Sequence, residues 1–238
     1  MSKSKPVLGV TLARGGSKGV PGKHLKLLSG RPLIDYTLDI VKDIKEIDYY
    51  LVSTDSEEIR SYVLGRGVSA PFLRPENLST DSASSAAALQ HAVNFIEKDL
   101  KTEFSYVIEL MATNPLKDAQ DVSACINQLA TSNFDAVIAV NEIFDHHPAR
   151  VKRITNGVLV DFCVPEIPES RRQDLEPKAY VRSGAIYALT REMLMHKGLR
   201  YGTDKCYAYV LPPDKAVNID SEQDFIYAEY LLNRRYNA

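Results

Sequence analysis

Short apolar runs alternate with amphipathic segments along the first 140 residues. Consecutive apolar positions are typical of strands buried on both faces, whereas apolar residues three and four apart indicate helices with one buried face. The runs predict strands at Val7–Leu12, Tyr49–Ser53, Gly67–Phe72, Tyr106–Leu110 and Ala136–Val140. The intervening segments predict helices at Pro32–Lys45, Glu57–Gly65, the region that follows the hydroxyl-rich residues 79–85, and Asp118–Thr131. This β-α alternation argues for a mostly parallel sheet with helices on both faces.

The pattern changes after residue 140. Residues 141–180 contain a His-His-Pro turn, several prolines and only a short alternating segment at Val158–Cys163. Strand-like patterns return at Tyr180–Thr190 and Tyr207–Leu211, and Asp220–Asn233 predicts a closing helix. We therefore expect an α/β domain built from residues 1–140 and 181–238, with residues 141–180 as an excursion from it.

The composition argues against several classes of function. The chain has 238 residues, 45% hydrophobic and 25% charged, which is enough for one globular domain with its own core. Its net charge of −2 gives no overall basic field for nucleic acid or an anionic membrane, and no apolar run is long enough to span a bilayer. The three cysteines are odd in number and far apart, which argues against disulfides and a zinc site and fits the cytoplasm.

The densest positive charge follows the first predicted strand, in the segment TLARGGSKGVPGKHLKLL at residues 11–28. Open parallel sheets bind ligands beyond the carboxyl ends of their strands, where this segment is expected. Its glycines let backbone N–H groups approach an anion, and Arg14, Lys18 and Lys23 add full charges. The segment indicates a polyphosphate site, with a basic surface loop as the alternative.

Two common phosphate motifs do not match this segment. The Walker pattern requires Ser or Thr after its Gly-Lys pair, but His24 follows Gly22 and Lys23, and Ser17 occupies the position of the first glycine. The dinucleotide fingerprint fails as well, because Ser17 stands where its second glycine belongs. The segment is therefore a different kind of phosphate loop.

The stretch LARGGSKGVPGKHLKLLSGRPLIDYTLD, residues 12–39, resembles the signature of the CMP-sugar-acid synthetases, the acylneuraminate cytidylyltransferase family. Further blocks match that family in its own order: VSTDSEEI, PFLRPENLSTDSASS, NPLKDAQDV, HHPAR, RRQDL, RSGAIYAL and NIDSEQDF. The resemblance covers nearly the whole chain. It implies a Rossmann-like three-layer α/β fold of the nucleotide-diphospho-sugar transferase type, with a small dimerisation excursion.

The resemblance also implies an activity. Such an enzyme transfers CMP from CTP to the anomeric hydroxyl of a nonulosonic or related keto-sugar acid and releases pyrophosphate. Its catalytic residues would be Arg14, Lys23 and Asp220, with the two basic side chains gripping the phosphates of CTP. The other nucleotide-binding residues would be Leu12, Ala13, Gly15, Gly16, Ser17, His24, Arg74, Ser84 and Ser85. Without the resemblance, both serines would be interpreted as ordinary helix caps.

The family binds Mg²⁺ through an Asp-Ile-Asp block, which here reads Asn218-Ile219-Asp220. Positions 218 and 220 share one face of an extended segment. Asp220 would be the main metal ligand, and Asn218 would offer a neutral carbonyl oxygen. A helix N-cap at Asp220 is the alternative.

The resemblance places the sugar acid against Met111, Thr113, Arg150, Arg182 and Gln173. Both arginines are partners for its carboxylate. In the family, the segment that corresponds to 141–180 makes the dimer contact and reaches the neighbouring site, which implies a homodimer with a shared active site. His146 and His147 have diverging side chains because they are adjacent, so we interpret them as turn and packing residues rather than a metal pair.

Three departures from the family pattern bear on the substrate. His24 replaces an asparagine that contacts the nucleotide, Met111 replaces a glutamine that faces the sugar, and Ser183 replaces the asparagine that follows Arg182. A thioether in place of an amide removes hydrogen bonds and suits a more apolar substituent. We therefore expect a modified nonulosonic acid or a related acid rather than N-acetylneuraminic acid. Two alternatives stay open: a cytidylyltransferase for a non-sugar acid such as a phosphonate, and a non-catalytic nucleotide-binding homologue.

Overall fold

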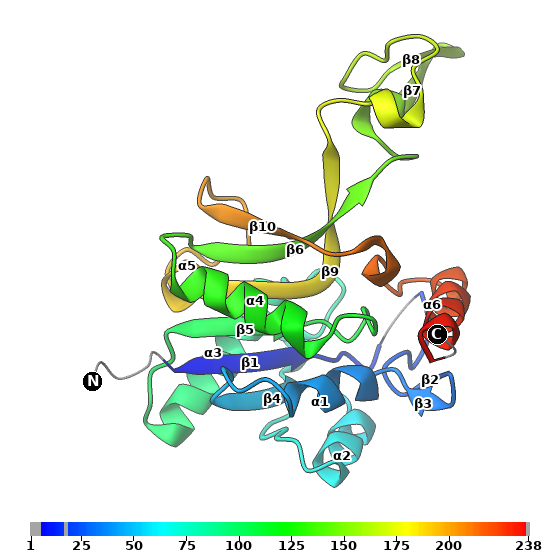
Figure 1. The fold of residues 1–238 in the computed structure, drawn as a ribbon. Coiled ribbons are helices and arrows are strands. Elements are labelled where there is room, and N and C mark those ends of the chain that lie inside the picture. Colours follow the sequence, from blue (N-terminus) through cyan, green and yellow to red (C-terminus); the bar gives the residue numbers. More distant parts are fainter. Residues whose placement is uncertain (1–5, 17–18, 237–238) are drawn as a thin grey trace.

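The computed structural model describes residues 6–16 and 19–236 of the chain. Its centre is a six-stranded sheet with the strand order β10-β6-β9-β5-β1-β4 (Figure 1). The strands span Val7–Leu12 (β1), Tyr49–Ser53 (β4), Tyr106–Leu110 (β5), Ala136–Ile143 (β6), Ala179–Thr190 (β9) and Cys206–Val210 (β10). β9 is antiparallel to both of its neighbours, and the other three pairings are parallel. The expected mostly parallel sheet is confirmed, with one antiparallel strand inside it.

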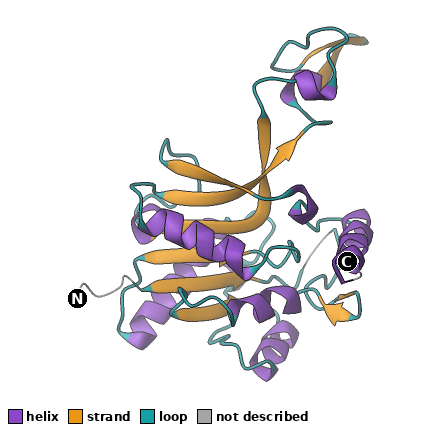
Figure 2. Cartoon of the chain, in the orientation of Figure 1, coloured by secondary structure: helices purple, strands orange, loops and turns teal. Residues whose placement is uncertain are grey.

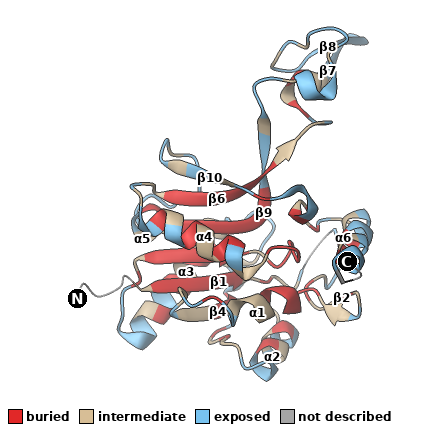
Figure 3. Cartoon of the chain, in the orientation of Figure 1, coloured by how far each residue is buried: buried red, intermediate tan, exposed pale blue. Residues whose placement is uncertain are grey.

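Helices cover both faces of the sheet, so the fold has the three expected layers (Figures 1 and 2). The α-helices of the described residues span Asp35–Val41 (α1), Glu57–Gly65 (α2), Ser85–Leu100 (α3), Ala119–Ala130 (α4), Arg191–Met195 (α5) and Glu222–Tyr236 (α6). On one face, Leu89 of α3 and Leu194 of α5 share a buried cluster with Val107 of β5. On the other face, Val122 of α4 packs with Ile108 of β5. The buried strands between these layers form the core (Figure 3).

Side-chain caps define where several helices begin. Ser56 Oγ accepts from the backbone N–H of Ile59 at the start of α2. At α6, the Asp224 carboxylate accepts from the backbone N–H of Ser221, and Ser221 Oγ accepts from that of Asp224. The cap of α6 is therefore made by Ser221 and Asp224, and the alternative in which the Asp220 side chain caps this helix is wrong.

Two expected elements differ in the structure. Residues 67–72 form one isolated bridge, between Ser69 and Leu51, rather than a strand, because Pro71 has no backbone N–H for a ladder. The helix expected at Pro32–Lys45 is shorter, since residues 31–32 (β3) pair with residues 27–28 (β2) in a small hairpin before α1 begins. Apolar periodicity does not distinguish this hairpin from a first helical turn.

β6 and β9 continue past the sheet as a pair and carry an arm, defined here as residues 144–178, away from the body (Figure 1). The pairing register shifts between Ile138 and Val140, and Gly184 of the facing strand has a φ of +61°, which glycine adopts readily. The arm contains the hairpin of β7 (Lys152–Thr155) and β8 (Val158–Asp161) and short 3₁₀ turns at Pro148–Arg150 and Arg172–Asp174. Most of its surface is exposed (Figure 3).

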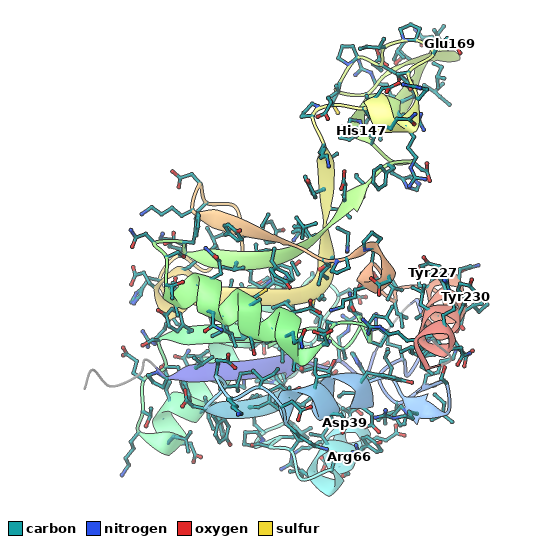
Figure 4. All side chains as sticks on the ribbon, viewed as in Figure 1. Asp39, Arg66, His147, Glu169, Tyr227 and Tyr230 are labelled. Carbon is teal, nitrogen blue, oxygen red and sulfur yellow. The ribbon has the colours of Figure 1, made fainter. Side chains whose placement is uncertain are left out.

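His147 is a packing residue within the arm (Figure 4). It is buried; its Nδ1 accepts from the backbone N–H of Ala149, and its Nε2 lies 2.9 Å from the carbonyl oxygen of Pro177. The neighbouring His146 is exposed. The interpretation of these residues as turn and packing residues is confirmed for His147. Among the residues that the structure describes, none belongs to a helix long and apolar enough to cross a membrane.

Candidate active site

A cavity of about 280 Å³ opens at the carboxyl ends of β1 and β5, beside the first residues of α3. Ten of the residues predicted for the site line it: Leu12, Arg14, Lys23, His24, Arg74, Ser84, Ser85, Met111, Thr113 and Asp220. These residues come from segments far apart in the sequence. The structure thus brings the predicted groups together, while the role of each stays a prediction.

Arg14 and Arg74 give one side of the cavity its positive charge. Arg14 donates to the carboxylate of Asp81 at 2.7 Å. Arg74 is buried; its Nε donates to Ser79 Oγ at 3.1 Å, and its guanidinium lies 3.7 Å from the Asp55 carboxylate. Burial lowers the pKa of Arg74 from its usual value, an effect that Asp55 opposes. The Arg74 guanidinium is therefore fixed by the fold before any ligand binds.

Lys23 connects the glycine-rich loop to the segment before α6. Its Nζ donates to the Ile219 carbonyl at 2.9 Å and to the Asp220 carboxylate at 3.1 Å. The backbone of the loop also lies close to the backbone of Asp220, because a Cβ on Gly19 would come within 2.0 Å of the Asp220 carbonyl oxygen. Only glycine fits at position 19 in this arrangement.

His24 lies under the same cavity and is 5% exposed. Its backbone carbonyl accepts from Ile34 N–H at 2.9 Å, whereas its buried Nδ1 has no hydrogen-bond partner among the described residues. Burial, and then the charges of Lys23 and Arg74, lower the pKa of His24 to about 4. The imidazole is therefore neutral at physiological pH.

Ser84 caps α3, since its Oγ accepts from the backbone N–H of Ala87 at 3.1 Å. The capping interpretation is confirmed for this serine. Both Ser84 and Ser85 also line the cavity, so the unpaired N–H groups of the first turn of α3 lie beside it. A helix N-terminus in this position favours an anion.

Asp220 and Asn218 were predicted as metal ligands. The exposed Asp220 carboxylate accepts from Asn218 Nδ2 at 2.6 Å, so the amide presents its donor to Asp220. Within the part of the chain that the structure describes, the buried Asn218 Oδ1 has no hydrogen-bond partner. It lies over Gly184, where a Cβ would come within 2.6 Å of it. The described residues contain no cluster of three or more His, Cys, Asp or Glu side chains suited to a metal. Asp220 therefore fits a Mg²⁺ ion that takes most of its ligands from substrate phosphates and water, rather than a preformed protein site.

Several predicted nucleotide residues do not line the cavity. Ala13, Gly15 and Gly16 follow β1 directly, and Gly15 N–H donates to the Asp55 carboxylate at 2.9 Å. Ser17, with its neighbour Lys18, lies outside the described residues.

The other residues predicted to bind the sugar acid lie in different parts of the structure. Arg150 and Gln173 belong to the arm, where Arg150 lies 3.7 Å from Glu166 and Gln173 lines a second cavity of about 270 Å³. Arg182 is on β9, with its guanidinium carbon 3.9 Å from the centre of the Tyr201 ring. Within one chain these three residues do not line the first cavity.

Sequence reasoning missed Glu109. This residue lies in β5, lines the cavity and is 1% exposed, and Arg200 Nη1 donates to its carboxylate at 2.5 Å. Burial raises the pKa of Glu109, and the nearby Arg200 guanidinium opposes that rise. The available signal was one carboxylate inside the otherwise apolar run Tyr106–Leu110.

Comparisons with known proteins agree over most of the chain. The profile of a family described as cytidylyltransferase matches residues 8–231. The chain is 31% identical over 226 residues to N-acylneuraminate cytidylyltransferase of Streptococcus agalactiae serotype V. The matched region covers 94% of this chain and 52% of that protein. It therefore spans about half the length of this curated relative. It is also 31% identical to pseudaminic acid cytidylyltransferase of Campylobacter jejuni, over 95% of this chain and 96% of that one.

Solved structures share the fold. A structure of CMP:2-keto-3-deoxy-manno-octonic acid synthetase complexed with CTP matches with a TM-score of 0.69 and 17% identity, over 97% of this chain and 99% of that chain. A 4-diphosphocytidyl-2C-methyl-D-erythritol synthase from Anaerococcus prevotii matches with a TM-score of 0.66 and 18% identity, over 97% of each chain. At these identities, the likeness shows the nucleotidyltransferase fold alone.

Proposed function

Because the chain belongs to the cytidylyltransferase family, we propose that it transfers CMP from CTP to the anomeric hydroxyl of a nonulosonic acid and releases pyrophosphate. The observation that carries this proposal is the convergence of Arg14, Lys23, Arg74 and Asp220 on one cavity at the carboxyl ends of the strands. Its curated relatives act on N-acylneuraminate and pseudaminic acid, both acidic sugars.

The cationic side of the cavity supports a triphosphate there. Arg14 and Lys23 are paired with Asp81 and Asp220, which are both exposed carboxylates. Because both carboxylates face solvent, a triphosphate with several negative charges can displace them from the two cations. The first turn of α3 adds backbone N–H groups beside Ser84 and Ser85.

In the proposed reaction, the acceptor oxygen forms a bond to the α-phosphorus while the bond from that phosphorus to the bridging oxygen breaks. Pyrophosphate leaves with the bonding electron pair, and the acceptor hydroxyl loses its proton. The protein forms no covalent intermediate, so its contribution is to position both substrates and to offset charge on the phosphate oxygens. Arg14 and Lys23 are the residues to which we assign this charge stabilisation, with Asp220 as the third catalytic residue.

Mg²⁺ is the proposed cofactor. Asp220 would hold it, with Asn218 able to contribute its unpaired amide oxygen only after the amide rotates away from its present donation to Asp220. When bound, the ion supplies positive charge to the phosphate oxygens. Lys23 Nζ donates to the Asp220 carboxylate and holds it at the cavity.

The acceptor is proposed to lie against Met111 and Thr113, which also line the cavity. A thioether favours an apolar substituent, which supports a modified nonulosonic acid over N-acetylneuraminic acid. Arg182 lies near the point where β9 leaves the sheet, and we assign it to the acceptor carboxylate.

A homodimer with a shared active site would bring the arm into this reaction. Ile154, Leu159 and Ile167 of the arm are 77%, 67% and 75% exposed, an unusual concentration of bare apolar side chains. Covering them with a second copy would also carry Arg150 and Gln173 toward the partner's cavity. Because CTP is a cytoplasmic metabolite, we place the reaction in the cytoplasm.

The test is pyrophosphate release from CTP and Mg²⁺ with a panel of acids: N-acetylneuraminic, legionaminic, pseudaminic and 2-keto-3-deoxy-octonic acids and a simple phosphonate. We expect release with a modified nonulosonic acid. Strong preference for N-acetylneuraminic acid contradicts the acceptor class. Release with the phosphonate alone favours the non-sugar alternative, and CTP binding without any release favours a non-catalytic homologue.

A further inference from the structure

Asp220 lies in a segment that has little regular structure of its own. Between β10 and α6 the structure describes every residue from 211 to 221, and the regular structure there is a short 3₁₀ turn at Pro213–Lys215. The place of the Asp220 carboxylate at the cavity therefore depends on the contacts that this segment makes with the rest of the fold.

Lys215 anchors the beginning of this segment to α4. It is 8% exposed, and its Nζ donates to the carboxylates of Asp118 at 2.5 Å and Asp121 at 2.7 Å. Asp118 is the N-cap of α4, and Asp121 lies in the first turn of that helix. Asp121 also accepts from the Tyr209 hydroxyl of β10 at 3.1 Å. The ammonium of Lys215 therefore joins the segment to the helix on one side of the sheet.

The cluster of Lys215, Asp118 and Asp121 has a function beyond stability. Burial lowers the pKa of Lys215, but its hydrogen bonds to the two carboxylates outweigh burial and raise that pKa, so the lysine is charged at physiological pH. Burying these charges is costly, and a well-packed apolar group of similar volume is often as stable. An apolar group, however, can slide along its neighbours, whereas an ammonium that is hydrogen-bonded to two carboxylates fixes the register of the chain.

The backbone of Lys215 is held as well. Asn114, which is fully buried in the loop after β5, donates from Nδ2 to the Lys215 carbonyl at 3.0 Å. Its Oδ1 accepts from the backbone N–H groups of Leu116 and Lys117, so both ends of the amide are paired. The same loop contributes Met111 and Thr113 to the cavity. The anchor thus ties the segment to the loop that forms part of the cavity wall.

The position of Lys215 is transmitted to Asp220 through a short stretch of chain. Val217 and Ile219 are buried and alternate with partly or fully exposed neighbours, which leaves Asp220 exposed. Ile219 N–H donates to the Thr113 carbonyl at 2.8 Å, and the Ile219 carbonyl accepts from Lys23 Nζ at 2.9 Å. Because a few residues have limited reach, a shift at position 215 strains these contacts and displaces the carboxylate.

We propose that Lys215 is a positioning residue for Asp220, a proposal that rests on the proposed cytidylyltransferase function. Lys215 fixes the beginning of the segment that carries Asp220, and thereby the place of this carboxylate opposite Lys23. Lys215 does not line the cavity, so it acts through the segment and not by contact with a substrate.

The test removes the ammonium by Lys215→Met, which keeps an unbranched side chain. Two quantities are compared with wild type: kcat for pyrophosphate release with the best acid of the panel, and hydrogen exchange of the Ile219 N–H. We expect kcat to fall by about tenfold or more, because a small displacement of a catalytic group has a large effect on rate. Exchange at Ile219 should become faster by about tenfold or more, while the N–H groups of β5 exchange as in wild type.

A second variant, Asp118→Asn, weakens the same anchor more gently. An asparagine keeps the cap of α4, since its amide oxygen accepts the hydrogen bond from Asp121 N–H, but it removes one of the two charges on Lys215. Asp118 is 39% exposed, so this variant is expected to fold even if Lys215→Met does not. It should change kcat and Ile219 exchange in the same directions, by about threefold each.

The matched control is Lys197→Met. Lys197 Nζ donates to the Asp135 carboxylate at 2.8 Å, before β6 begins, and neither residue lines the cavity. This variant should keep the wild-type kcat and the wild-type exchange at Ile219. Thermal unfolding of all variants reports any common loss of stability.

The outcomes separate this inference from the proposed function. Wild-type kcat or wild-type Ile219 exchange in a folded Lys215→Met protein overturns the inference and leaves the cytidylyltransferase function intact. An equal rise of exchange at Ile219 and throughout β5 also overturns it, because that result indicates a general loss of stability. If Lys215→Met does not fold, the same criteria apply to Asp118→Asn. A wild type that releases no pyrophosphate with any acid overturns the proposed function, and the exchange at Ile219 then decides alone whether Lys215 holds the segment.

Discussion

Lys23 and Asp220 are separated by 197 positions in the sequence and meet at 3.1 Å. The same segment is tied to β5's continuation, because the backbone N–H of Ile219 donates to the Thr113 carbonyl at 2.8 Å. The glycine-rich loop, the end of β5 and the segment before α6 are therefore joined in one place. The candidate site is complete only when the beginning and the end of the chain have both folded.

Replacing Lys23 by alanine should reduce catalysis much more than stability. The ammonium is expected to offset charge on the phosphates, and loss of such a group lowers kcat by about 100-fold or more. Its ion pair with exposed Asp220 contributes at most about 1 kcal/mol to the free energy of unfolding. Steady-state pyrophosphate release and urea unfolding measure the two effects.

Lys26→Ala is the control for that variant. Lys26 also connects the loop to the α6 region, through Glu222 at 2.6 Å, but it does not line the cavity. Its kcat should remain near that of wild type. Similar losses of activity in both variants would contradict the catalytic role of Lys23.

Asn218→Asp should strengthen the dependence on Mg²⁺. The substitution replaces a neutral amide, 2.6 Å from Asp220, by a second carboxylate oxygen donor. We expect half-maximal activity at an Mg²⁺ concentration lower by about tenfold, since about 1.4 kcal/mol of added metal affinity has this effect. A titration of activity with Mg²⁺ at saturating CTP measures the shift, and an unchanged midpoint would place the metal away from position 218.

His24 should make folding sensitive to acid. Its pKa is about 4 in the folded chain and near 6.5 when exposed, so the unfolded chain takes up a proton first as the pH falls. The stability linked to neutral His24 is present above pH 6.5 and is lost as the pH falls through about 4. Between pH 7 and pH 5 wild type should lose about 1–2 kcal/mol more than His24→Asn.

Urea unfolding at pH 7 and pH 5 measures that difference. His146→Asn is the matched control, because this histidine is exposed. If His24→Asn and wild type lose equal stability between these pH values, the buried neutral imidazole is excluded.

The arm should be needed for association. Ile154→Glu combined with Leu159→Glu places two charges on apolar side chains that are 77% and 67% exposed, which opposes burial against a second copy. We expect a monomer with wild-type thermal stability and a strongly reduced kcat, measured by light scattering, thermal unfolding and pyrophosphate release. Ile226→Glu on α6, where the side chain is 70% exposed, should leave the mass unchanged. A double variant that keeps the wild-type mass would exclude the arm as the interface.

The sequence predicts the sheet strands well because burial on both faces leaves continuous apolar runs such as Tyr106–Leu110. It does not predict that Tyr180–Thr190 runs antiparallel, since an apolar run has no direction. The expected strand at Gly67–Phe72 was wrong for a reason visible in Pro71, which cannot donate to a ladder.

The residues of the candidate site were also predictable only in part. Arg14, Lys23 and Arg74 lie in contiguous blocks, so local motifs reveal them. Glu109 and Arg200 are far apart in the sequence, and neither belongs to a phosphate motif. Their proximity depends on the position of the segment after α5, which no local pattern specifies.

The base of the arm is a pair of facing residues, Ile143 and Ala179. Both ends of the arm therefore leave the body at one point, and the intervening chain can change in length without stretching β6 or β9. The described residues that line the first cavity all lie outside the arm, so a change in the length of the arm leaves that lining unchanged. The junction at Ile143 and Ala179 is thus a suitable boundary for a chimeric protein, in which the arm of one cytidylyltransferase replaces that of another.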